Sequence, residues 1–215
     1  MTSIFPLSQN GLRFEQRPES PGVLFAVDEK KKTLAWQTAV HSSPFTSAEL
    51  APSGDELVLG SQTPGLIFVV NLKKHTAKVL HYPVTLSKGA VKLTPKGWVY
   101  QVTMTLVNTL QRPLQLDGPS VGEDSYLTNS LFEVTADATR RIEYRGEMAK
   151  RGPPDSFITV NPGQKHTATL DLTEAYPVPA TVKHLSIAFS HQNHFSPDDF
   201  SMRTAVPLEL DAPRP

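Results

Sequence analysis

The feature that most constrains this 215-residue chain is an alternation of apolar and polar residues with a period of two. In the segment WVYQVTMTLVN, residues 98–108, every second side chain is apolar and those between them include one Gln and two Thr. The apolar positions are Trp98, Tyr100, Val102, Met104 and Leu106. Because successive side chains of an extended strand point to opposite faces, this pattern predicts a half-buried antiparallel strand.

Helical signals are weak throughout the sequence. Nineteen prolines are spread along the chain, and no window of about a dozen residues keeps the i, i+3, i+4, i+7 apolar spacing of a helix. Alternating segments such as HTATLDL and VKHLSIAFS are separated instead by turn-forming runs such as DGPS and NPGQ. We therefore predict an all-β protein, with an Ig-like antiparallel β-sandwich over residues 89–215.

Residues 1–88 have a different texture and predict a smaller β-meander of hairpins. Three segments each hold two apolar runs around a polar turn: GVLFAVDEKKKTLAWQT, AELAPSGDELVLGSQ and GLIFVVNLKKHTAKVLHYPV. They resemble the strands of one propeller blade, and one such unit cannot close a propeller ring. We place the seam between the two parts at LSKGA, residues 86–90.

Composition narrows the function classes. Cysteine is absent, so disulfides, thiolate metal sites and thiol nucleophiles are excluded. Basic and acidic side chains number 21 each, which gives no electrostatic reason to expect a nucleic acid partner. No segment has the roughly 20 apolar residues of a membrane span, and no export signal is visible, so we expect a soluble cytoplasmic protein that carries no cofactor.

The region from Trp98 to about Phe189 resembles a known family. The segments VTMTLVNTLQRPLQL, NSLFEVT, IEYRGEMAKRGPPDSFITVNPGQ and ATLDLTEAYPV occur in this order. Together they are similar to the non-catalytic N-terminal β-sandwich domain of deuterolysin-like metallopeptidases, which include the peptidyl-Lys metalloendopeptidases. The resemblance covers a little under half of the chain and implies an accessory domain that normally precedes a zinc-dependent catalytic domain.

The zinc-binding motif of that family has no counterpart here. In that family an HExxH helix supplies two imidazole ligands and a general base, and a later GTxDxxYG-type motif supplies an Asp ligand. Here none of the seven histidines is followed by Glu, and the Gly-Thr dipeptide that begins the second motif does not occur. We therefore expect a chain without catalytic activity.

The segment GEMAKRGPPDSF, residues 146–157, is the candidate binding loop. Its candidate residues, with the arginine just before it, are Arg145, Lys150, Arg151, Pro153 and Pro154. One interpretation is a structural crossover whose prolines fix the backbone and whose cations are solvated. The other is a preordered loop that inserts Lys150 into an acidic pocket, since rigidity lowers the entropy lost on binding.

A second candidate lies in SHQNHFSPDDF, where His191, His194 and Asp198 are ligand types for zinc. A surface turn with incidental histidines is the alternative.

Three functions remain open from the sequence. The first is a protein-binding module, with a metallopeptidase as partner and inhibition or immunity as its role. The second is a structural or glycan-binding β module, which exposed aromatics among Trp36, Tyr82 and Tyr126 would favour. The third is a hydrolase built on His191, His194 and Asp198.

Overall fold

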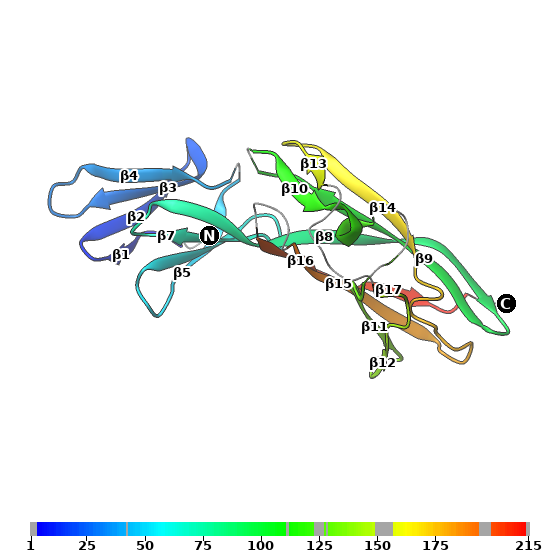
Figure 1. The fold of residues 1–215 in the computed structure, drawn as a ribbon. Helices are drawn as coiled ribbons and strands as arrows, with labels where there is room; N and C mark the ends of the chain where they lie inside the picture. Colours follow the sequence, from blue (N-terminus) through cyan, green and yellow to red (C-terminus); the bar gives the residue numbers. More distant parts are fainter. Residues whose placement is uncertain are drawn as a thin grey trace. The chain divides into compact units, whose positions relative to one another are not determined.

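The structure is a computed structural model in which the chain divides into two compact units (Figure 1). It describes residues 4–41, 43–110, 112–122, 127, 129–148, 157–193 and 199–213. Unit 1 comprises Met1–Tyr82 with Thr109–Arg112, and unit 2 comprises Pro83–Asn108 with Pro113–Pro215. The predicted seam, residues 86–90, lies inside the long strand β8, Thr76–Thr94, which begins in unit 1 and continues into unit 2.

Unit 1 consists of two antiparallel ladders, drawn from blue to cyan in Figure 1. The first has the order β1-β2-β3-β4, and the second joins β5, β6, β7 and the start of β8. The strands are β1 Leu7–Gln9, β2 Leu12–Arg17, β3 Ser20–Asp28, β4 Leu34–Ala39, β5 Phe45–Leu50, β6 Glu56–Ser61 and β7 Ile67–Asn71.

Side chains in the turns of unit 1 explain why its hairpins form. Asp28 accepts the backbone N–H groups of Lys30 and Lys31 at 2.9 Å, which closes the β3–β4 turn. Asn71 does the same for Lys73 and Lys74 between β7 and β8. Short Asp and Asn side chains favour turns because they replace strand hydrogen bonds locally.

The strand pairs of unit 2 that are named below are also antiparallel. One sheet has the order β8-β9-β14, a second is built around β15, which pairs with β11, β16 and β17, and β10 pairs with β13. β12 extends the second sheet by pairing with β11. The elements are β9 Gly97–Val107, β10 Leu114–Asp117, the 3₁₀ turn η1 Gly118–Val121, β11 Phe132–Ala136, β12 Arg140–Ile142, β13 Phe157–Val160, β14 Lys165–Asp171, β15 His184–Asn193, β16 Phe200–Thr204 and β17 Leu208–Asp211.

The alternation read from residues 98–108 corresponds to the core of unit 2. All five apolar side chains of that pattern are buried on β9, as are Val134 of β11 and Ile187 of β15. Edge-to-face contacts of Phe132 with Tyr176 and Phe189 continue this core at centroid distances of 6.4 and 5.5 Å. The Tyr100 hydroxyl of β9 also donates to the Tyr176 carbonyl at 2.8 Å, so Tyr176 links β9 to Phe132 of β11 in a sandwich-like core.

The predicted all-β class is confirmed, because η1 is the only helical element among the described residues. In that part of the chain, no helix is long and apolar enough to span a membrane.

Candidate functional site

Of the five residues predicted for the binding loop, the structure describes Arg145. Lys150, Arg151, Pro153 and Pro154 lie outside the described residues, and so do His194 and Asp198 of the candidate metal site. His191 lies on β15, where it pairs with Met202 of β16. Both predictions therefore stay predictions, and Arg145 alone locates the first of them on the fold.

The backbone around Arg145 is held by a tyrosine. The Arg145 N–H donates to the carbonyl of Ala175 at 2.7 Å. The hydroxyl of neighbouring Tyr144 lies 2.7 Å from the carbonyl oxygen of Glu147 and donates to it, while its ring packs edge-on against Tyr176 at 5.3 Å. Burial raises the pKa of Tyr144, so the hydroxyl remains a donor at physiological pH. These contacts fix residues 144–147 and leave the Arg145 side chain exposed.

Arg145 lines a polar cavity of about 600 Å³ in unit 2. Three carboxylates, those of Glu147, Asp171 and Glu174, line the same cavity. Asp171 is the last residue of β14, and its carboxylate caps the following turn by accepting the Thr173 N–H at 2.9 Å. The cavity therefore offers both signs of charge, with the acidic side chains in excess.

An apolar groove adjoins this cavity. Its volume is about 540 Å³, and its walls include Trp98, Pro177 and Val178. Val99 and Thr173 line both hollows, which makes the two concave surfaces continuous. The Val99 side chain is 39% exposed, although it sits on a strand whose other face is the core. We call the two hollows together the Val99 surface.

Gly97 shapes the floor of the groove. Its φ of 141° belongs to a region that residues with a side chain rarely adopt. The Trp98 N–H also donates to the Val178 carbonyl at 3.0 Å, which draws the two backbones together. The groove of the Val99 surface is therefore built where the backbone of β9 is hydrogen bonded to the loop that contains Val178.

The chemistry of the Val99 surface suits recognition. Apolar walls beside a few charged side chains are the usual make-up of a binding hollow. In the described part of the chain, no group of three or more His, Asp or Glu side chains is arranged to hold a metal ion.

A cluster on the second sheet of unit 2 escaped the sequence analysis. His184 hydrogen bonds through Nδ1 to Asp211 at 2.9 Å and through Nε2 to Glu209 at 2.8 Å, and Ser186 donates to Glu209 at 2.8 Å. Two hydrogen bonds raise the pKa of His184, the larger contribution coming from Asp211 and the smaller from Glu209. The ring therefore links β15 to β17 at the surface, and its protonated form can donate to both carboxylates.

The aromatic residues named for glycan binding are not exposed platforms where they are described. Tyr82 is fully buried, and the half-buried Trp36 is stacked on His75 with centroids 4.6 Å apart. Tyr126 lies outside the described residues.

A scan against models of protein families finds no match for the chain, and a search of curated proteins finds none either. The resemblance to the accessory domain of deuterolysin-like metallopeptidases therefore stays a prediction.

Proposed function

We propose that the chain is a non-catalytic protein-binding module that docks its partner on the Val99 surface. The observation that carries this proposal is the continuity of a charged cavity with an apolar groove through Val99 and Thr173. A protein interface commonly combines an apolar centre with a polar rim. The groove supplies the apolar centre, and Arg145 with its neighbouring carboxylates supplies the polar rim.

Rigidity of the scaffold supports the same proposal. The Val99 surface is formed by β9, by the end of β14 and by a loop that Tyr144 and Tyr176 hold in place. A surface that is already ordered loses little conformational entropy when it binds.

The partner that we propose is a metallopeptidase, because unit 2 contains the segments that resemble an accessory domain of deuterolysin-like enzymes. Inhibition or immunity is the role that follows from such a complex. Arg145 at the rim would then meet a carboxylate of the enzyme, and Val99 would be buried in the contact.

The experiment is a titration of the full chain against a panel of zinc metallopeptidases that includes deuterolysin-like enzymes. Val99→Asp places a charge in the groove, so we expect affinity to fall at least tenfold. The matched control is Val107→Asp, because Val107 is a similarly exposed valine, 44%, at the other end of β9. It should change affinity less than twofold.

Absence of saturable binding to every peptidase would contradict the proposed partner. Equal losses in Val99→Asp and Val107→Asp would contradict the proposed surface.

A further inference from the structure

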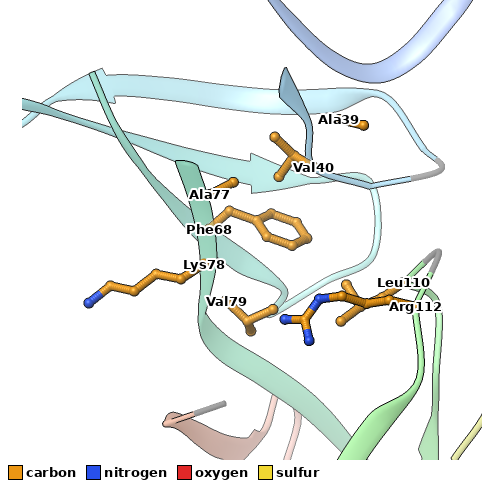
Figure 2. Close-up of a pocket in the computed structure, with 8 residues that line it drawn as sticks. All are labelled: Ala39, Val40, Phe68, Ala77, Lys78, Val79, Leu110 and Arg112. Carbon is orange, nitrogen blue, oxygen red and sulfur yellow. The ribbon is translucent and has the colours of Figure 1, made fainter. Parts of the chain in front are cut away.

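A small cavity in unit 1 is separate from the Val99 surface (Figure 2). It encloses about 190 Å³ and is lined by the end of β4, by β7, by β8 and by the segment Thr109–Arg112. A ligand of similar size has few heavy atoms.

The walls of this cavity are apolar. They are formed by Ala39, Val40, Phe68, Ala77, Val79 and Leu110. Phe68, Val79 and Leu110 are buried, so the inner wall is part of the core of unit 1. An apolar body is therefore the ligand portion that gains most from entering.

The buried ring of His41, which contacts Phe68, does not make this wall charged. His41 packs against the Phe68 ring with centroids 5.5 Å apart and is 1% exposed. Burial lowers the pKa of His41, so its ring is neutral at physiological pH. It adds no charge to the wall.

The charged side chain that faces the cavity is Arg112. Figure 2 shows its guanidinium reaching toward Val79, while the Lys78 ammonium points away from Phe68. None of the described residues that line the cavity carries a carboxylate. A guanidinium has five N–H donors, so it can hold a carboxylate in addition to the further contact that Arg112 makes in the chain.

We propose that this cavity binds a small monocarboxylate with a branched apolar body, the carboxylate paired with Arg112 and the body packed against Phe68 and Val79. Arg pairs with carboxylates through two parallel hydrogen bonds, which also orients the ligand. Both a free short-chain acid and the C-terminal residue of a peptide present this chemistry.

The experiment is a titration of the full chain with isovalerate and with N-acetyl-leucine, followed by NMR of the Val and Leu methyl groups. Saturable shifts at Val40, Val79 and Leu110 are expected with at least one of the two. Binding of isovalerate alone assigns the free acid, and binding of N-acetyl-leucine alone assigns the peptide C-terminus. Isopentylamine has the same body with a cationic end and should not bind.

Variants separate the two parts of the proposal. Arg112→Gln should weaken binding at least tenfold, whereas Lys78→Gln should leave it within twofold. Ala77→Leu fills the cavity while Arg112 remains, and it should abolish binding even if Arg112→Gln fails to fold. Lack of saturation by either acid, equal binding of isopentylamine, or unchanged binding in Ala77→Leu would overturn the proposal.

Discussion

Two buried aromatic side chains of unit 2 have hydrogen-bond partners for their polar groups, whereas two aromatic side chains of unit 1, Trp36 and His41, lack them in the described part of the chain. In unit 2 the Trp98 indole N–H donates to the Val182 carbonyl at 3.2 Å. The Tyr100 hydroxyl donates to the Tyr176 carbonyl at 2.8 Å. In unit 1 the indole N–H of Trp36 and both ring nitrogens of His41 are buried without a hydrogen-bond partner among the described residues.

This difference shows how each unit tolerates polar aromatic residues in its core. A buried polar group that loses its partner costs about 1–3 kcal/mol, so satisfied groups become essential to the fold. A group that never had a partner can be replaced by an apolar one at little cost. We therefore expect unit 2 to depend on its hydrogen-bonded core residues and unit 1 to lose little stability when Trp36 or His41 is replaced by an apolar residue.

The largest expected effect comes from the two tryptophans, one in each unit. Trp98→Phe leaves the Val182 carbonyl unpaired and removes volume from a side chain that is 2% exposed. We expect it to destabilise unit 2 by about 2–4 kcal/mol. Trp36→Phe removes an unpaired N–H and should cost unit 1 less than about 1 kcal/mol. Native-state amide exchange of β9 and β3 measures the two effects, and a larger loss in Trp36→Phe would break the comparison.

The second-largest expected effect is the pH dependence of the stability of unit 1. Burial lowers the pKa of His41 from its ordinary 6.5, so the folded state binds a proton less readily than the unfolded state. The stability of unit 1 is therefore complete above pH 6.5 and declines as the pH falls below it.

His41→Leu should abolish this acid sensitivity and leave unit 1 at least as stable at neutral pH, because two unpaired nitrogens are removed. Urea unfolding, followed by Trp36 fluorescence in a Trp98→Phe background, tests this between pH 5 and 8. An acid sensitivity that persists unchanged in His41→Leu would assign it to another group.

The smallest effect has the opposite sign and lies in unit 2. Hydrogen bonds to Asp211 and Glu209 raise the pKa of His184, so the link between β15 and β17 is complete below pH 6.5. It is lost as the pH rises through the raised pKa. The His184 side chain is 38% exposed, so solvent screens the interaction and the gain in stability is small.

NMR titration of the His184 ring protons should give a pKa above 6.5 that returns toward this value in Asp211→Asn. A pKa at or below 6.5 in the unmodified chain would contradict the proposed link.

Local patterns predicted many of the strands. The alternation of residues 98–108 predicted the buried face of β9, and the polar turns between paired apolar runs predicted two hairpins that Asp28 and Asn71 close. The Asn10–Gly11 turn between β1 and β2 was overlooked, although Asn-Gly is the strongest short hairpin signal.

Contacts that depend on which residues of two paired strands lie opposite each other could not be predicted from the sequence. His184 and Asp211 are far apart in the sequence and meet because β15 and β17 pair in one register. The Val99 surface likewise needs β9, the end of β14 and the Arg145 segment to be brought together. The segment LSKGA, residues 86–90, was predicted as a seam, yet it lies within β8, which has a register shift between Lys88 and Val91.

The central claim is that unit 2 docks a protein on the Val99 surface, and the most direct test is methyl NMR of the full chain. A metallopeptidase is added until saturation, and the signals of Val99 and Val107 are compared. The account predicts that the Val99 methyl groups shift or broaden while those of Val107 are unchanged. A saturated complex in which Val107 responds and Val99 does not would contradict it.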